Sequence, residues 1–361
     1  MDYRSTPSVQ IDLDIAEQNI RSALEALSRH GIAHRPHIKA HKSTYLALMQ
    51  TALGCKGITC AKLGEAEVMA DAGIDDILLA YPLIGEDKLS RYRLLLEREM
   101  TIRTIINSVP GAKGLSLLGN AMGKPVSVLV ELDGGLNRGG IKPGDVEGFV
   151  REVMPMHGIS IEGVCCYGGD IYACKTMDEI RVRAAKERDD ILAAARCMQK
   201  LGLSPHVLSG GSSFSLLCPE ELHGLTEVRA GNYIFNDNAL LSIGVIGLDA
   251  CAMRVLATVV SRPDENTAIV DAGSKTLTTD TVWSRPGYGY VPEEPGAVIY
   301  KLNEEHGFVR HEKPLNWQIG ETITIIPNHA CTVPNLCDEI YGMRGGRLAI
   351  PISIEARGKN R

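Results

Sequence analysis

Through its first 240 residues the chain alternates short apolar runs with longer amphipathic stretches, and no other pattern in it restricts the fold as strongly. The runs are rich in Val, Ile and Leu and apolar on both faces, as strands of a helix-covered parallel sheet are. Several amphipathic stretches end at a helix-stopping glycine, such as Gly54, Gly73 and Gly202. The runs cover residues 36–39, 57–61, 76–81, 101–107, 126–133, 159–167, 206–211 and 227–232. Eight β/α alternations predict a closed (β/α)8 TIM-like barrel, with an open doubly wound sheet as the alternative.

The pattern changes after about residue 245. Strand-like segments separated by Pro, Gly and acidic turns cover residues 251–261, 267–278, 296–301, 321–327 and 348–355. No long helical pattern lies between them, so we expect a second, mostly β domain. The strand-like segment 8–13 precedes the first barrel strand and is expected to join that domain. The predicted domains are therefore a barrel over 15–244 and a β domain over 245–361 together with 1–14.

Composition excludes several classes of function. The 361 residues carry 38 basic and 44 acidic side chains, a net charge of −6, so no basic surplus indicates binding to nucleic acid or to an anionic membrane. No window approaches the ~18 apolar residues that span a bilayer, and the start MDYRSTPSVQ does not resemble a signal peptide. The ten cysteines are scattered and form no CxxC motif, which is typical of thiols in a reducing cytosol. We expect a cytoplasmic protein.

The ends of the predicted strands carry the candidate chemistry, because barrel active sites lie at the carboxyl ends of the strands. Lys39 closes the first apolar run. A desolvated lysine there has a lowered pKa and can form a Schiff base, whereas the alternative is a solvated surface lysine. The turn Gly-Gly-Ser-Ser at 210–213 follows the seventh run, where barrels often bind a phosphate, although it is also a plausible flexible turn. An amine and an anion site together suggest pyridoxal phosphate.

Several motifs resemble those of fold-type III pyridoxal-phosphate enzymes, the alanine racemase superfamily. They include PHIKAHK at 36–42 and the fifth apolar run with the loop that ends in Arg138. More narrowly, the chain resembles the D-threonine aldolase and D-serine dehydratase family, in GITCAKLGEAEVM (57–69), SGGSS (209–213), TEVRAGNYIFND (226–237), DAGSKTLTTD (271–280) and PNHAC (327–331). The resemblance covers nearly the whole chain. It implies a barrel of the alanine racemase N-terminal type, a mostly β C-terminal domain and a homodimer.

The resemblance also implies roles for single residues. Lys39 resembles the cofactor lysine, Arg138 the arginine that holds the phenolic oxygen of the cofactor, and Tyr167 the tyrosine beside the pyridine ring. The residues that fall in phosphate-binding stretches are Gly210, Gly211, Ser212, Ser213, Gly231 and Asn232. Many relatives carry a histidine just after the tyrosine, whereas this chain has Gly168-Gly169-Asp170. The contacts to the substrate carboxylate therefore stay open.

A His-x-Cys pair in the second domain suggests a metal. In an extended segment the side chains of His329 and Cys331 point the same way and can share one cation, although this spacing also recurs by chance. The resemblance strengthens the prediction, because dehydratases of this family use such a pair for zinc. Aldolases of the family more often have Asp at the position of Cys331. A thiolate favours zinc, and manganese or magnesium are the alternatives.

The predicted function is that of a lyase acting on a D-β-hydroxy amino acid. A dehydratase of the D-serine or D-threo-3-hydroxyaspartate type, which releases a keto acid and ammonia, is favoured because of Cys331. A D-threonine aldolase, which releases glycine and an aldehyde, is the first alternative. An amino-acid racemase on the same scaffold is the second, but it gains nothing from a metal. A non-catalytic pyridoxal-phosphate-binding barrel is the third, and it would lack the β domain.

Overall fold

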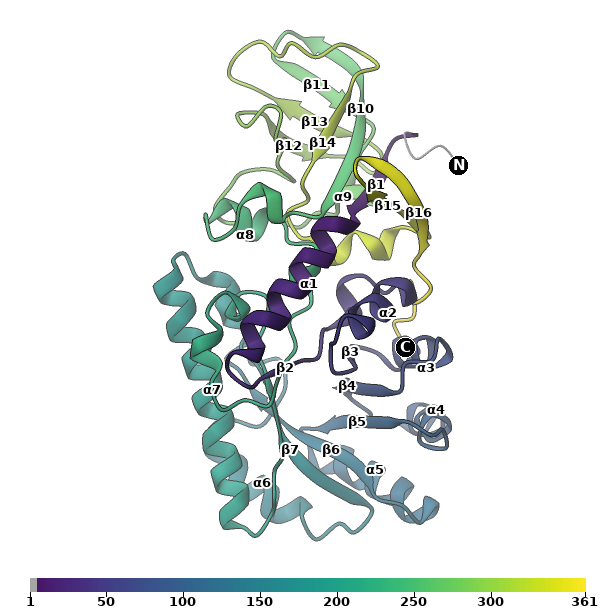
Figure 1. Ribbon diagram of the computed structural model, residues 1–361, viewed down its shortest axis with the longest axis vertical. Helices are drawn as coiled ribbons and strands as arrows, with labels where there is room; N and C mark the ends of the chain where they lie inside the picture. Colours follow the sequence, from purple (N-terminus) through teal and green to yellow (C-terminus); the bar gives the residue numbers. More distant parts are fainter. Residues whose placement is uncertain (1–4) are drawn as a thin grey trace. The chain divides into compact units, whose positions relative to one another are not determined.

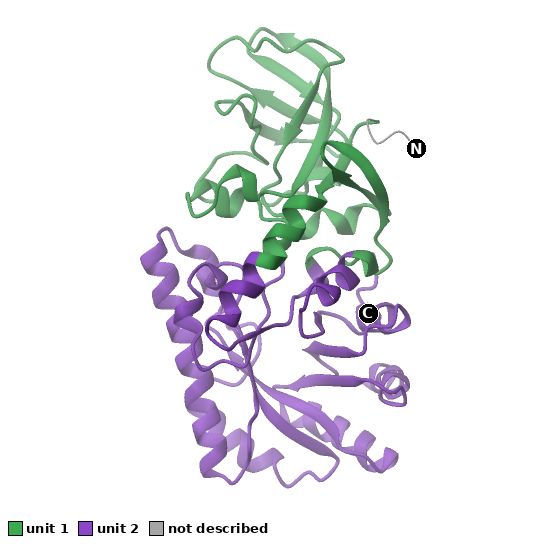
Figure 2. Cartoon of the chain, in the orientation of Figure 1, with its two compact units in different colours: residues 1–21, 40–45, 232–358 green, residues 22–39, 46–231, 359–361 purple. Residues whose placement is uncertain are grey.

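The computed structural model describes residues 5–361, and the chain forms two compact units (Figure 2). Residues 1–4, on which part of the prediction about a signal peptide depends, lie outside the described residues. The domain boundaries expected from the sequence stay a prediction. Unit 1 comprises residues 1–21, 40–45 and 232–358, and unit 2 comprises residues 22–39, 46–231 and 359–361.

Unit 2 contains eight parallel strands in the order β2-β9-β8-β7-β6-β5-β4-β3 (Figure 1). The strands are β2 (Ala33–His34), β3 (Ile58–Cys60), β4 (Asp76–Pro82), β5 (Thr101–Ile106), β6 (Val126–Asp133), β7 (Ile159–Tyr167), β8 (Val207–Gly210) and β9 (Glu227–Val228). The two ends of this sheet are joined, because Lys56 N–H donates to the His34 carbonyl and Thr59 N–H to the Pro36 carbonyl, both at 2.8 Å. The predicted alanine racemase-type barrel is confirmed.

The first barrel strand lies earlier than predicted. We expected it at residues 36–39, but β2 is Ala33–His34 and Lys39 lies in the short 3-10 helix η1 (Ile38–Ala40). Pro36 has no N–H to contribute to a ladder. The chain still follows β9 beyond β2, since the N–H of Arg35 donates to the Val228 carbonyl at 2.9 Å and that of His37 to the Ala230 carbonyl at 3.1 Å. Lys39 therefore lies in a turn of 3-10 helix that directly follows this extended segment.

Helices alternate with the strands of unit 2. Two of them, α1 (Leu13–Ser28) and α2 (Thr44–Ala52), run from one unit into the other. The others are α3 (Leu63–Asp71), α4 (Glu86–Leu96), α5 (Val109–Met122), α6 (Val146–Val153) and α7 (Met177–Lys200). The long helix α7 ends shortly before Gly202 and packs against β7 and β8 (Figure 1). Among residues 5–361, no helix is both long enough and apolar enough to cross a membrane.

Unit 1 is mostly β, as the sequence predicts. Its strands are β1 (Ser8–Asp12), β10 (Met253–Asp264), β11 (Thr267–Val270), β12 (Val298–Leu302), β13 (Gly307–Arg310), β14 (Thr322–Ile325), β15 (Glu339–Arg344) and β16 (Arg347–Ser353). The predicted strand over 8–13 is present as β1, which pairs antiparallel with β10 and parallel with β15. The segment predicted as one strand over 267–278 ends at Val270 and continues into the helical turn α9 (Ser274–Leu277). Unit 1 also contains α8 (Asn238–Ser242).

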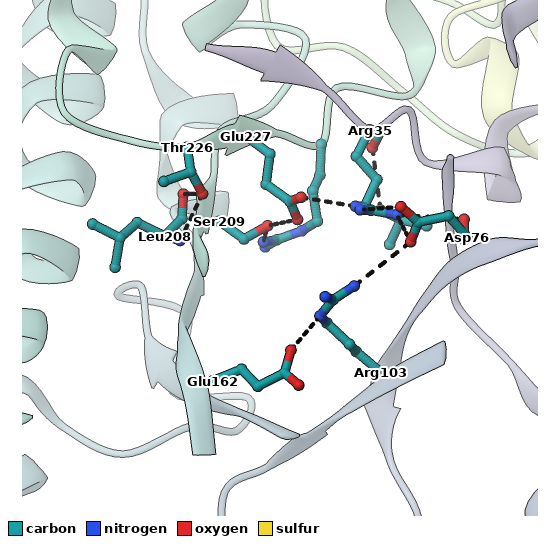
Figure 3. A network of polar contacts seen from close by, with 10 residues as sticks. Arg35, Asp76, Arg103, Glu162, Leu208, Ser209, Thr226 and Glu227 are labelled. Atoms are coloured by element: carbon teal, nitrogen blue, oxygen red, sulfur yellow. Dashed lines mark hydrogen bonds and ion pairs between the residues drawn. The ribbon is translucent and has the colours of Figure 1, made fainter. Parts of the chain in front are cut away.

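A buried arginine links strands of the barrel that are distant in sequence (Figure 3). The side chain of Arg35 is only 2% exposed. Its Nε donates to Glu227 Oε2 at 2.8 Å, and its two terminal nitrogens donate to the Asp76 carboxylate at 2.8 and 3.1 Å. Burial alone would raise the pKa of Glu227, but the charge and hydrogen bond of Arg35 and the Ser209 hydroxyl more than offset it, so this pKa lies below its ordinary value.

The same network extends around the sheet. Arg103 of β5 lies between Asp76, at 3.7 Å, and Glu162 of β7, at 2.6 Å. The hydroxyl of Ser127 in β6 donates to Glu162 at 2.6 Å. On the other side of Glu227, the Ser209 hydroxyl of β8 donates to the Glu227 carboxylate at 2.8 Å. Charged and polar side chains thus connect the segment after β2 with β4 to β9.

We predict that Arg35→Met lowers the free energy of unfolding by about 3–5 kcal/mol, because it leaves the Glu227 carboxylate buried without its partner. Urea denaturation measures the loss. The control is Arg93→Ala, which removes an exposed i,i+4 pair with Glu97 and should cost no more than about 0.5 kcal/mol. The double variant Arg35→Met, Glu227→Leu should recover part of the loss. Equal stability of the Arg35 and Arg93 variants would contradict the prediction.

Candidate active site

Three of the predicted site residues meet around the ring of Tyr167 in unit 2. Tyr167 is the last residue of β7. Lys39 Nζ and the Arg138 guanidinium carbon each lie 5.4 Å from the centroid of this ring, within the range in which a cation is attracted to an aromatic face. The structure therefore brings together an amine, a guanidinium and a phenol that are far apart in the sequence.

The loop that carries Arg138 is fixed to the end of β6. Ile141 N–H donates to the Glu131 carbonyl at 2.8 Å, and Asp133 N–H donates back to the Ile141 carbonyl at 3.0 Å. The Asp133 carboxylate accepts the N–H groups of Gly135 and Asn137, both at 3.1 Å. Arg138 itself is exposed. The backbone of the loop is thus ordered by hydrogen bonds, while the guanidinium stays accessible to a ligand.

The two predicted phosphate-binding stretches of unit 2 are neighbours. Gly210 ends β8, and its carbonyl accepts the N–H of Arg229 at 2.8 Å, so the turn at 210–213 lies beside the segment that leads to Gly231. All four residues of that turn are buried. A Cβ at position 231 would lie 2.7 Å from the carbonyl oxygen of His37, so the close approach of these backbones requires glycine.

These residues suit pyridoxal phosphate. A lysine amine matches its aldehyde, a guanidinium its phenolic oxygen, an aromatic side chain its ring, and a buried glycine-rich turn its phosphate. Lys39, Arg138, Tyr167, the turn at 210–213 and Gly231 all belong to unit 2. The close backbone contact at Gly231 shows that this stretch is packed against His37 and is not a loose loop.

The remaining predicted residues, Asn232, His329 and Cys331, belong to unit 1, where a buried carboxylate joins them. Asp237 Oδ2 accepts the side-chain amide of Asn232 at 2.7 Å and the N–H of Ala330 at 3.0 Å. The buried Oδ1 of Asn232 has no hydrogen-bond partner among the residues that the structure describes. Sequence reasoning missed Asp237, although it lies in a quoted motif.

His329 and Cys331 contact each other, although only one of them is extended. His329 has extended dihedral angles, whereas Cys331 lies in the 3-10 turn η8 (Ala330–Thr332), so the predicted extended segment is wrong for Cys331. Cys331 nevertheless acts on the His329 ring, because a side-chain hydrogen bond with Cys331 is among the causes that raise the pKa of His329. His329 Nδ1 lies 3.1 Å from Asp280 Oδ2, which also accepts the Thr332 hydroxyl at 3.0 Å. Sequence reasoning also missed Asp280, which is 49 residues from His329, although it ends the quoted motif DAGSKTLTTD (271–280).

The charge state of His329 reflects these neighbours. Burial lowers its pKa, but the hydrogen bond and charge of Cys331, together with the charges of Asp237 and Asp280, raise it to about 9. Within residues 5–361, no group of three or more His, Cys, Asp or Glu side chains is placed to hold a metal. An imidazole and a sulfur in contact suit zinc as a two-ligand site with open positions, and Asp280 would orient the imidazole.

Comparison with known proteins identifies the class to which this fold and site belong. The family model "Alanine racemase, N-terminal domain" matches residues 11–239, and a serine dehydratase domain matches residues 252–343. The D-threo-3-hydroxyaspartate dehydratase of Delftia sp. (strain HT23) is 33% identical over 345 residues, with 90% of each chain covered. The D-threonine aldolase of Arthrobacter sp. is 32% identical over 365 residues, covering 99% of this chain and 93% of the relative.

Comparison with solved structures indicates the same family. A D-threo-3-hydroxyaspartate dehydratase mutant in the metal-free form superposes with a TM-score of 0.90 at 30% identity, with 97% of each chain covered. The fold is that of fold-type III pyridoxal-phosphate enzymes. The chain belongs to the D-threonine aldolase and D-serine dehydratase family within the alanine racemase superfamily. Its named relatives are dehydratases and aldolases, which are lyases of D-β-hydroxy amino acids, and pyridoxal phosphate is the cofactor expected of the family.

We predict that Cys331→Ala lowers the pKa of His329 from about 9 toward the ordinary value of about 6.5. Cys331 makes the largest of the contributions that raise this pKa. The measurement is a pH titration of the ¹³Cε1 signals of labelled histidine in metal-free protein. Cys337→Ala is the control and should leave the signal of His329 unchanged. Titration of His329 near pH 9 in Cys331→Ala would contradict the contact between the two side chains.

Proposed function

We propose that this chain is a pyridoxal-phosphate- and divalent-metal-dependent lyase that dehydrates a D-β-hydroxy amino acid of the D-serine or D-threo-3-hydroxyaspartate type. The products are a keto acid and ammonia. The observation that carries the proposal is the convergence of Lys39 and Arg138 on the ring of Tyr167. The contact between His329 and a sulfur ligand, rather than a carboxylate at that position, favours dehydration.

Each cofactor-binding residue has a distinct role in this proposal. Lys39 Nζ would hold the cofactor aldehyde, and its amine would act as the base that takes the proton from Cα of the substrate. Arg138 binds the phenolic oxygen through its permanent charge, and Tyr167 lies beside the pyridine ring. The phosphate would be held by Gly210, Gly211, Ser212, Ser213, Gly231 and Asn232. When bound, pyridoxal phosphate withdraws electrons from Cα and so makes its proton acidic.

The metal would be held by His329 and Cys331. Zinc is favoured because one ligand is a sulfur, and manganese or magnesium are the alternatives. A divalent ion held there would polarise the β-hydroxyl of the substrate. Asp280 accepts a hydrogen bond from His329 Nδ1 and so leaves the other ring nitrogen to bind the metal.

Aldol cleavage is the competing function. The relative named D-threonine aldolase matches almost as closely as the one named D-threo-3-hydroxyaspartate dehydratase, at 32% against 33% identity. In that reaction a base removes the β-hydroxyl proton and the Cα–Cβ bond breaks, which gives glycine and an aldehyde. A racemase is less favoured, because proton exchange at Cα has no use for a metal.

We also propose a cytoplasmic homodimer with a small-molecule D-amino acid substrate and no nucleic-acid or membrane partner.

We predict that Lys39 carries the cofactor. The purified protein should be yellow, and borohydride should link the cofactor irreversibly to Lys39 Nζ, as peptide mass spectrometry reports. Lys39→Arg should abolish the colour, the adduct and turnover, because a guanidinium does not form a Schiff base. The matched control Lys42→Arg should retain all three. An adduct on Lys42, or full turnover in Lys39→Arg, would overturn the assignment.

We also predict that turnover needs a divalent metal. A chelator should lower kcat by about a hundredfold or more, the size expected for loss of a Lewis acid. The cofactor absorbance should persist, because the metal pair and the lysine belong to different units. Zinc or manganese should restore activity. Cys331→Ala should behave like the chelated enzyme and Cys337→Ala like the wild type, so unimpaired turnover in Cys331→Ala would exclude this metal site.

The products distinguish the two lyase reactions. D-serine, D-threonine and D-threo-3-hydroxyaspartate are each incubated with the enzyme, and keto acid, ammonia, glycine and aldehyde are assayed separately. We expect keto acid and ammonia. Glycine and acetaldehyde from D-threonine, with no ammonia from D-serine, would instead identify an aldolase.

A further inference from the structure

Glu187 occupies a position of α7 where an apolar residue is expected. The buried face of this helix follows the steps of four and three residues that place side chains on one side, and its buried residues are Ile180, Ala184, Glu187, Arg188, Ile191, Ala194, Ala195 and Met198. Only 4% of Glu187 is exposed. Burying an ionisable side chain costs free energy unless hydrogen bonds compensate for the lost water. The partners of Glu187 therefore indicate why it is there.

Those partners are backbone N–H groups from two separate turns of unit 2. Glu187 Oε1 accepts the N–H of Gly211 at 2.9 Å. The carboxylate also faces Gly168: a Cβ at position 168 would lie only 3.2 Å from Glu187 Oε2, and a hydrogen bond from the Gly168 backbone is among the causes that lower the pKa of Glu187. Burial raises the pKa of Glu187, and the hydrogen bond from Gly211, the charge of Arg229 and the hydrogen bond from Gly168 offset this only in part.

Both turns belong to the candidate cofactor site. Gly168 directly follows Tyr167, and Gly211 lies within the glycine-rich turn at 210–213. We infer that Glu187 is a positioning residue that ties these two turns together and so sets the distance between the ring end and the phosphate end of the site. The inference rests on the function proposed above. A ligand with a ring at one end and a phosphate at the other is held at both ends only if the two turns keep a fixed separation.

The chemistry of the side chain explains why a carboxylate stands here. Its two oxygens accept hydrogen bonds from donors on two different segments, and it presents no donor of its own when ionised. Glutamine has nearly the same shape, but one of the two N–H groups would then face an NH₂ group. Glu187→Gln therefore breaks one of the two ties while it preserves packing, and Glu187→Leu breaks both.

The test compares cofactor binding by three variants with that of the wild type. Pyridoxal phosphate is titrated into cofactor-free protein, and its absorbance gives Kd. The ³¹P signal of the bound cofactor reports the environment of its phosphate. Glu187→Gln should raise Kd about tenfold or more, as expected for a lost hydrogen bond to a charged group, and should shift or broaden the ³¹P signal. Asp189→Asn, on the same helix and 65% exposed, is the control and should change neither.

Amide hydrogen exchange tests the tie without the cofactor. Peptides that contain Gly168 and Gly211 should exchange about tenfold faster in Glu187→Gln than in the wild type and the Asp189→Asn control, because an N–H without its acceptor opens more readily. A purely packing role would change thermal stability but neither Kd nor local exchange.

The possible failures are distinguishable. Wild-type Kd and wild-type exchange in Glu187→Gln would overturn this inference and leave the proposed function intact. A wild-type protein that binds no pyridoxal phosphate would overturn the proposed function instead. Glu187→Leu should show the larger effect, and if this variant does not fold, Glu187→Gln alone decides.

Discussion

The buried guanidinium of Arg35 is the constraint on which the geometry of unit 2 depends. Parallel strands lack the tight turns that fix the register of hairpins, so segments from residues 33 to 228 must be aligned by contacts across the sheet. Arg35 follows the first strand, and its ion pairs reach Asp76 of β4 and Glu227 of β9. An unpaired buried charge costs several kcal/mol. Only an arrangement that brings both carboxylates to Arg35 avoids that cost.

The same network leads from the register of the strands to the candidate site. Glu227 accepts the Ser209 hydroxyl, and Ser209 in turn accepts a hydrogen bond from Arg229 at 2.6 Å. Arg229 also donates to the Cys166 carbonyl at 2.5 Å. Ser209 precedes the glycine-rich turn and Cys166 precedes Tyr167. Polar side chains that align the strands are therefore adjacent in the chain to the residues proposed to bind the cofactor, so errors in register would displace the site.

The sequence predicts the features of this protein that depend on local pattern. Most barrel strands are rich in Val, Ile and Leu, and α7 keeps one periodicity throughout, so these elements were predictable from short windows. The place of β2 was not, because Pro36 interrupts the ladder while the chain stays extended. Arg35 gave no signal either, since its partners are 41 and 192 residues away. Glu187 did offer one, as an acid in the apolar stripe of a helix, but the N–H groups that it contacts are known only from the fold.

In each of the two units a buried carboxylate accepts hydrogen bonds from the segments that carry the candidate residues. In unit 2 the buried Glu187 accepts N–H groups beside Tyr167 and in the glycine-rich turn. In unit 1 the buried Asp237 accepts the side chain of Asn232 and the N–H between His329 and Cys331. Burial raises the pKa of both acids, and in both cases hydrogen bonds from site segments offset it in part.

In unit 1 the position of the backbone at the candidate metal pair therefore does not depend on which side chain stands at position 331. Asp237 holds the segment at Ala330 through a main-chain N–H, which is present whatever side chain stands at the neighbouring position 331. A sulfur or a carboxylate at position 331 would therefore meet the His329 ring from the same backbone. Because a sulfur favours zinc and a carboxylate favours harder cations, one substitution would change which cation the proposed metal pair prefers, without a change of fold. Such independence is compatible with relatives that share this scaffold and differ in reaction, as dehydratases and aldolases do.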